Sequence, residues 1–215
     1  MKTVSKYFET LRDWKKLPAY KAEPRVDSIV GFALPQILKH ALNLDVKVVI
    51  PELPLRVGTI YRKHEGTNYS NKSYKVDFFA LTTSNENYLI EFKTDSGSRR
   101  EGQDKYLEAS KEVGIGAIIT GILTLFEKTS YKKKYEHLLG KLLQAQLIQG
   151  EHPAYKPSAA NDSIKIVYIQ PHIKSNDENL TIIDFNSVHD AIIQNFPNDE
   201  FMVEAAKTFK GWESN

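Results

Sequence analysis

The chain has 215 residues, which is enough for one substantial hydrophobic core and too short for two domains to be the first expectation, so we predict a single domain over residues 1–215. Hydrophobic residues make up 41% and charged residues 26%, a balance typical of a folded soluble protein rather than a disordered chain. The net charge of only +2 requires any nucleic-acid partner to be held by a local patch, and the absence of cysteine excludes disulfides, thiolate zinc sites and a cysteine nucleophile.

Neither a signal peptide nor a membrane-spanning helix is expected. The first residues, MKTVSKYFETLRDW, place charges where a signal peptide needs an unbroken apolar stretch. The longest apolar run, GIGAIITGILTLF at residues 114–126, is shorter than the roughly 20 residues that cross a bilayer. We therefore predict a buried core segment here, and a cytoplasmic protein without membrane contact.

The first predicted elements are a helix and an edge strand. Pro24 suits the first position of a helix that extends to about Leu42, with a kink at Pro35. The next segment, Val46–Arg56, is rich in β-branched residues but contains two prolines. This composition favours a strand at the edge of a sheet or one entered through an irregular lead-in.

A hairpin and several helices follow. Tyr74–Leu81 (YKVDFFAL) and Tyr88–Phe92 (YLIEF) have strand composition and are joined by the polar turn TTSNEN. Ser98 and Glu101 then match the reciprocal capping pattern of a helix that runs to about Val113. The remaining expectations are an apolar helix to about residue 127, a helix at 131–149, a long connection at 151–163, a strand at 164–170, a helix at about 187–195 and a weakly structured tail.

Three charged residues interrupt the apolar strands of this hairpin. With a turn centred near residues 84 and 85, antiparallel pairing joins positions whose numbers sum to roughly 168 to 170. Asp77 then faces Glu91 or Lys93, and the last two share a face because side chains on one face repeat every second residue. We expect the three charges to converge.

Such a cluster predicts a metal site. Ionised groups on a mostly buried sheet are costly unless something compensates them, and a divalent cation would compensate Asp77 and Glu91. Mg²⁺ or Mn²⁺ suits two carboxylates, because hard cations choose oxygen ligands and Mg²⁺ keeps waters that a phosphate can replace. Lys93 beside the metal could orient an attacking water and balance charge on the phosphate.

The acid-x-lysine triplet is not rare by itself. Asp13–Lys15 and Asp45–Lys47 also match it. The triplet Glu91–Lys93 differs because it ends an apolar strand and has an acidic residue at the matching position of the preceding strand. An ordinary salt bridge at the end of a hairpin is the alternative interpretation.

Asp77 with Glu91-Phe92-Lys93 resembles the PD-(D/E)XK nuclease superfamily, in which a helix, a hairpin and a second helix surround these residue types. Val76 stands where the superfamily pattern has a proline, a position that varies widely. The resemblance implies an α/β fold with a restriction-endonuclease-like core at about residues 24–170. That core is a mixed central sheet flanked by helices, with the acidic site on the hairpin and a helical insertion at about 114–149.

The resemblance also implies further catalytic and metal-binding groups. Gln103 and Tyr106 look like a shortened form of the Gln-x-x-x-Tyr signature of exonuclease branches of the superfamily. The main-chain carbonyl of Phe92 would be a metal ligand. Many members add an acidic residue from the first helix, for which Asp27 is the first candidate and Glu23 the second.

Three basic residues near the start of the helix after Lys93 are candidates for binding nucleic acid. Arg99 lies on the same helix face as Gln103, and Arg100 and Lys105 are close in sequence. The equally weighted alternative is a solvated, salt-bridged helix surface.

Together these inferences predict a Mg²⁺- or Mn²⁺-dependent nuclease that hydrolyses phosphodiester bonds in nucleic acid, with DNA as the expected substrate. Two alternatives stay open. One is a catalytically inactive module with the nuclease fold that binds nucleic acid or a protein partner. The other is an interaction domain that forms a homodimer through its apolar helices at 114–149.

Overall fold

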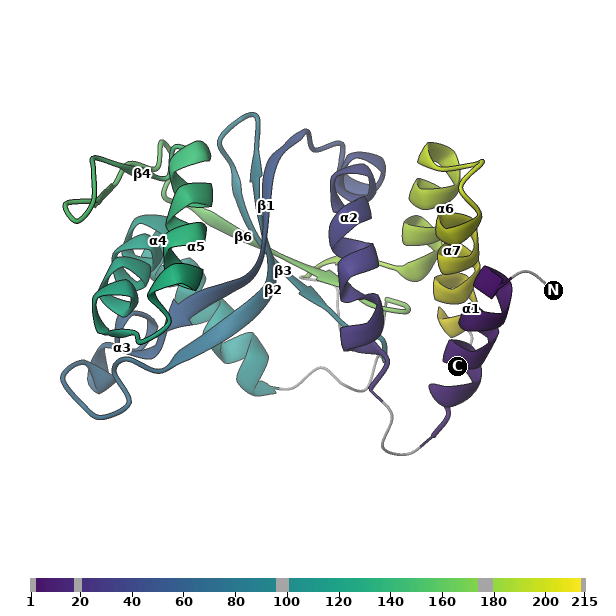
Figure 1. Cartoon of the computed structure of the whole chain (residues 1–215), viewed down its shortest axis with the longest axis horizontal. Coiled ribbons are helices and arrows are strands. Elements are labelled where there is room, and N and C mark those ends of the chain that lie inside the picture. Colours follow the sequence, from purple (N-terminus) through teal and green to yellow (C-terminus); the bar gives the residue numbers. More distant parts are fainter. Residues whose placement is uncertain (1–2, 18–20, 96–100, 174–179, 214–215) are drawn as a thin grey trace. The chain divides into compact units, whose positions relative to one another are not determined.

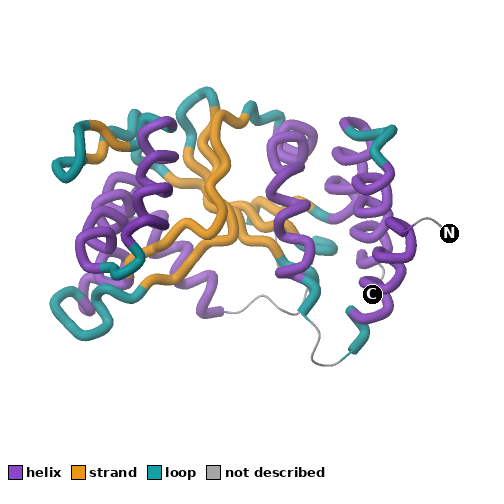
Figure 2. The backbone as a smooth tube through the Cα atoms, viewed as in Figure 1, coloured by secondary structure: helices purple, strands orange, loops and turns teal. Residues whose placement is uncertain are grey.

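Five strands form one mixed sheet. The computed structural model, which describes residues 3–17, 21–95, 101–173 and 180–213, orders them β1-β2-β3-β6-β7. β2 and β3 are antiparallel whereas β6 and β7 are parallel, and helices flank the sheet (Figure 2). The predicted α/β class is confirmed, as is the edge position of β1. The strands are β1 (Val46–Arg56), β2 (Ser73–Thr82), β3 (Asn87–Phe92), β6 (Ile164–Ile169) and β7 (Thr181–Ile183).

The other elements are helices and a small second sheet. β4 (Ile148–Gln149) and β5 (Lys156–Pro157) pair antiparallel, so the predicted long connection contains a short strand. The helices in the described part of the chain are α1 (Thr3–Trp14), α2 (Glu23–Leu42), α3 (Val57–Ile60), the 3-10 helix η1 (Arg62–His64), α4 (Glu101–Lys128), α5 (Lys132–Gln144), α6 (Phe185–Asn195) and α7 (Glu200–Glu213) (Figure 1).

The chain divides into two compact units, each assembled from separate stretches of sequence. The first unit contains residues 1–46, 91–99 and 167–215, and the second contains residues 47–90 and 100–166. Glu91 and Lys93 therefore belong to the first unit, and Asp77 belongs to the second.

The first unit packs its helices around an aromatic core. α1 packs on α7, and α6 packs on both α2 and α7 (Figure 1). The ring centroids of Phe92, Phe185 and Phe209 lie 5.4 to 6.3 Å apart, and all three side chains are buried. Buried aromatic pairs of this kind contribute about 0.5–1.5 kcal/mol beyond the area they bury. Since Phe92 is the middle residue of the acid-x-lysine triplet, this core anchors the triplet.

The prediction of a weakly structured tail is wrong. Residues 200–213 form α7, in which Met202, Ala205, Ala206, Phe209 and Trp212 are buried at helical spacing. These apolar positions follow the period that indicates an amphipathic helix. α1 and β7, which were not predicted, belong to the same unit.

The hairpin of the second unit has the predicted pairing. Phe78 pairs with Ile90 and Phe79 with Leu89, and the pairing continues to Leu81 with Asn87. The turn closes through Thr82, whose hydroxyl accepts a hydrogen bond from the Glu86 main-chain nitrogen at 2.9 Å. Such side-chain to main-chain bonds favour tight turns, and the turn fixes the register of a hairpin.

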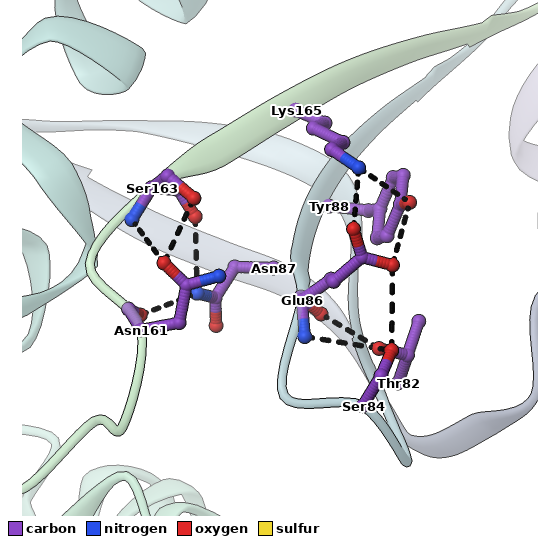
Figure 3. Close-up of polar contacts among 8 residues, drawn as sticks. All are labelled: Thr82, Ser84, Glu86, Asn87, Tyr88, Asn161, Ser163 and Lys165. Carbon is purple, nitrogen blue, oxygen red and sulfur yellow. Dashed lines mark hydrogen bonds and ion pairs between the residues drawn. The ribbon is translucent and has the colours of Figure 1, made fainter.

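A polar cluster ties this turn to the start of β6 (Figure 3). The buried side chain of Asn87 donates to the carbonyls of Asn161 at 2.7 Å and Ser163 at 3.1 Å. Glu86 forms an ion pair with Lys165, and the hydrogen bond from Lys165 holds the pKa of Glu86 below its usual value. The turn is thereby held at two points.

α4 is broken at Gly114, as predicted. This residue has a φ of 81° and a ψ of 166°, a conformation that is open almost only to glycine. The helix restarts at Ile115, where Asp162 accepts two hydrogen bonds from main-chain nitrogens. The carbonyl of Asp162 accepts from the nitrogen of Ile115 at 3.0 Å, and the carboxylate of Asp162 accepts from the nitrogen of Gly116 at 2.7 Å.

The apolar residues that motivated the dimerisation alternative are mostly buried within the second unit. α4 is long and apolar enough to cross a membrane by length and composition alone, but half of its most apolar stretch is buried inside the protein, as in the core helix of a soluble domain. Leu139 and Leu142 of α5 are buried as well. These residues belong to the core of the second unit, and a homodimer through the helices at 114–149 remains a prediction.

Gly114→Ala should destabilise the protein. A Cβ at residue 114 would lie 2.3 Å from the Asp162 carboxylate, and the positive φ disfavours any side chain. We expect a loss of about 1–3 kcal/mol in the free energy of unfolding, measured by chemical denaturation. The matched control is Gly140→Ala in α5, where a Cβ meets nothing within 4 Å and alanine should stabilise by about 0.5–1 kcal/mol. Equal effects at the two positions would contradict this account.

Candidate functional site

Glu91 and Lys93 form a buried ion pair in the first unit. Glu91 is 1% exposed and Lys93 is 3% exposed, and the Lys93 Nζ lies 2.8 Å from Glu91 Oε1. Their contact confirms that they share one face, while the ring of Phe92 between them packs among Phe185 and Phe209. A buried pair of charges is costly to desolvate and needs further hydrogen bonds.

Main-chain groups supply some of these bonds. The Lys93 ammonium donates to the carbonyl of Phe92 at 2.8 Å. The main-chain nitrogen of Lys93 donates to the carbonyl of Ile169 at 2.8 Å, which extends the pairing beyond the end of β3. The lysine is thus fixed at both its main chain and its side-chain tip.

α2 contributes a second acid to Lys93. Glu23, the first residue of this helix, places Oε1 3.6 Å from the Lys93 Nζ. Asp27, the first candidate from this helix, lies one turn later and is half-buried, with Oδ1 accepting from the Ser28 main-chain nitrogen at 2.6 Å. Residues four apart share a helix face, so both acids lie on the same side of α2.

Lys15 is a basic residue near this site that was not among the predicted site residues. Its Nζ lies 2.9 Å from Asp95, two residues beyond Lys93, and 5.1 Å from the ring centroid of Trp212. The acid-x-lysine pattern of Asp13–Lys15 did not indicate this, because α1 approaches Asp95 only through the tertiary packing of the first unit.

Asp77 lies in β2 in the second unit. It is half-buried and is the one charged residue in a run of otherwise buried positions from Val76 to Leu81. An acid in such a run is costly unless it has a compensating partner. Its placement in the strand agrees with the prediction, and its participation in a metal site remains a prediction.

The substrate-side candidates on α4 differ in their surroundings. Gln103 is half-buried, whereas Tyr106 is buried, with its ring stacked on Tyr74 at a centroid distance of 4.9 Å. Lys105 is exposed and pairs with Glu101 at 2.7 Å, as the salt-bridged alternative expected. Arg99, Arg100 and the capping residue Ser98 lie outside the described residues.

The oxygen donors around Lys93 fit a hard cation. The Glu91 carboxylate and the Phe92 carbonyl both contact one positive group, the ammonium of Lys93. Oxygen atoms that converge on a cation in this way are the ligand type that Mg²⁺ and Mn²⁺ select. Within the described residues, no group of three or more His, Asp or Glu side chains is arranged to hold a metal. Any metal site here would therefore combine carboxylates with a main-chain carbonyl.

Comparison of the chain with protein-family models, with curated protein sequences and with solved structures finds no match. The resemblance to the PD-(D/E)XK superfamily therefore rests on the residues and on the order of the elements.

A double-mutant cycle on Glu91→Gln and Lys93→Met should reveal strong coupling. Each single change leaves the other buried charge without its partner, so we expect each to lower the free energy of unfolding by about 3–5 kcal/mol. The double variant should lose clearly less than the sum of the two single losses. Chemical denaturation in the presence of a chelator measures this.

The control cycle uses Glu108 and Lys111, an exposed pair on α4 with 3.5 Å between the charged groups. Its coupling should stay below about 1 kcal/mol. Additive losses at Glu91 and Lys93 would show that their contact does not stabilise the fold.

Proposed function

We propose that the protein is a Mg²⁺- or Mn²⁺-dependent nuclease of the PD-(D/E)XK type that hydrolyses phosphodiester bonds in nucleic acid, with DNA as the expected substrate. The observation that carries the proposal is the buried triplet at the end of β3, where Glu91 and the Phe92 carbonyl share one cation, Lys93. A salt bridge that served stability alone would gain little from such burial, because its desolvation cost offsets most of the attraction.

The register of the hairpin supports Asp77 as the second acid. The observed pairs run from Leu81 with Asn87 to Phe78 with Ile90. The numbers of these paired residues sum to 168, as the sequence predicted, and on that ground we keep Asp77 as the proposed second acid.

In this proposal Asp77, Glu91 and the Phe92 carbonyl hold the metal. When bound, the metal would lower the pKa of a coordinated water and neutralise charge on the phosphate. Asp27 is an additional candidate ligand from α2, together with Glu23.

Lys93 would position the attacking water and balance the charge that develops on the phosphate. The ammonium of Lys93 has a second anionic neighbour in Glu23, at 3.6 Å. If a metal displaced the ammonium from Glu91, Lys93 would still have this opposite charge nearby.

The remaining predicted residues would contact the substrate. Gln103 and Tyr106 lie one turn apart on α4, which places them on one helix face. Arg99, Arg100 and Lys105 are proposed contacts to phosphate groups, in line with the need for a local basic patch in a chain of low net charge.

Nuclease activity is the direct test of this proposal. With Mg²⁺ or Mn²⁺, the wild-type protein should cleave labelled DNA in a gel assay, and Asp77→Asn, Glu91→Ala and Lys93→Ala should each lower the rate about a hundredfold or more. The control Glu108→Ala removes an exposed acid of α4 and should leave the rate unchanged. Melting curves identify any variant that has lost its fold. If the folded wild type cleaves neither DNA nor RNA with either metal, the enzyme proposal is wrong.

Metal affinity should separate the ligands from the lysine. Titration calorimetry with Mn²⁺ should show at least about tenfold weaker binding for Asp77→Asn and Glu91→Gln, since even outer partners of a metal change affinity about 10–100-fold. Lys93→Met should instead bind Mn²⁺ more tightly than wild type, because it removes a cation that contacts the same oxygen atoms. Equal affinity in all four proteins would overturn the assignment and leave the inactive binding module as the better account.

A further inference from the structure

The connection between α3 and β2 concentrates positive charge. Residues 61–75 contain Arg62, Lys63, Lys72 and Lys75 and a single acid, Glu65. These four cations and one acid give the segment a net charge of +3, compared with +2 for the whole chain. Lys75 pairs with Glu52 at 3.3 Å. Among the described residues no acid pairs with the other three cations, so they are available to an anionic partner.

The same segment carries a connected row of aromatic rings. Tyr106 of α4 stacks on Tyr74 with 11° between the ring planes. From Tyr74 the contacts continue to Tyr61 at 6.4 Å, from Tyr61 to His64 at 6.3 Å, and from His64 to Tyr69 at 6.3 Å. Tyr69 is 57% exposed and Tyr74 is 43% exposed. Exposed aromatic groups gathered in this way mark binding surfaces.

Cations lie beside these rings. The Nζ of Lys72 lies 4.5 Å from the ring centroid of Tyr69. Burial and the nearby Tyr74 raise the pKa of Tyr61 above its ordinary value. Positive groups interleaved with ring faces suit a polyanion that carries its own flat apolar groups.

A buried arginine holds the segment in shape. Arg56 at the end of β1 donates to both oxygens of Glu65, at 2.6 and 3.0 Å, to Ser70 at 2.6 Å and to Asn71 at 3.0 Å. Gly58 lies so close that an added Cβ would be 2.3 Å from the Glu65 carboxylate. The hydrogen bond from Arg56 keeps the pKa of Glu65 below its usual value. At neutral pH this acid is therefore ionised and paired with Arg56. A loop that is ordered before binding loses less entropy when a ligand arrives.

We propose that residues 61–75, with the ring of Tyr74 backed by the buried Tyr106, form a binding surface for single-stranded nucleic acid, on which bases stack against Tyr69 and Tyr74 while Arg62, Lys63 and Lys72 contact the phosphates. A single strand is the occupant because its bases expose their faces, whereas those of a duplex are stacked on one another. A purely apolar partner would leave the three cations unused. This inference deepens the proposed function, since it names the form of the substrate. Cleavage of the bound strand rests on the proposed function, whereas binding does not.

Binding can be measured without turnover. Fluorescence anisotropy with a labelled 20-nucleotide oligothymidine, in a chelating buffer, should show tighter binding than the duplex of the same length. Tyr69→Ala and Tyr74→Ala should each weaken binding about fivefold to a hundredfold, while Tyr69→Phe, which keeps the ring, should bind as wild type. Lys63→Gln should reduce the dependence of log affinity on log salt by about 0.7, the value for one phosphate contact on a single strand.

The matched control is Tyr131→Ala. Tyr131 is 68% exposed and has Lys134 5.9 Å from its ring centroid, but it lies before α5 rather than in residues 61–75. Its loss should leave binding unchanged. An equal loss of binding in the Tyr131 and Tyr69 variants would show that residues 61–75 are not the binding surface. Equal affinity for duplex and single strand would overturn the proposed preference for a single strand. Binding of neither would overturn the whole inference.

Glu91→Ala separates this inference from the proposed function. It should abolish cleavage and keep binding to the oligothymidine, because the carboxylate is not part of the surface. Binding that depends on Tyr69 in a protein without nuclease activity would refute the enzyme and keep the surface. Cleavage that is unaffected by Tyr69→Ala and Tyr74→Ala, with unchanged affinity, would refute the surface and keep the enzyme.

Discussion

The ammonium group of Lys93 has given up nearly all of its water and holds in exchange the Glu91 carboxylate and the Phe92 carbonyl, both at 2.8 Å. Several contacts in the first unit stabilise this buried arrangement. The carbonyl of Ile169 fixes the main chain of the lysine, and the aromatic core around Phe92 prevents the triplet from rotating. A buried pair whose partners could separate would cost more than it contributes. The fold and the candidate site thus depend on the same few atoms.

This dependence has a chemical meaning. In the proposed metal site, Lys93 contacts the same oxygen atoms that a divalent cation would use. Glu23 is a second acid near its ammonium, so the charge of Lys93 has two anionic neighbours. Under the proposed function, stability without a metal and affinity for a metal would be opposing demands on one group.

Much of this arrangement could be predicted from the sequence because it is local. The alternation of apolar residues, the polar turn and the two-residue spacing of Glu91 and Lys93 determine a hairpin and its shared face, and the structure has both. The predicted end of one helix at about Val113 agrees with the break of α4 at Gly114. Residues 200–213 were expected to be a weakly structured tail, although their apolar residues have the helical period that α7 shows. Glu23 was a candidate acid, but its ion pair with Lys93 could not be predicted, and neither could that of Lys15 with Asp95, because both depend on packing between elements far apart along the chain.

The first unit is assembled from separate stretches of the sequence, and this affects how it folds during synthesis. Its aromatic core joins Phe92 to Phe209, and α1 packs on α7, so α1 leaves the ribosome well before the helix on which it packs. The second unit is complete once residue 166 has emerged. Translation proceeds at about 5–20 residues per second, so α1 spends many seconds without the surface that buries Phe8 and Leu11. During this interval the apolar face of α1 lacks its partner, and the aromatic core around the triplet at β3 can close only after Phe209 of α7 has been synthesised.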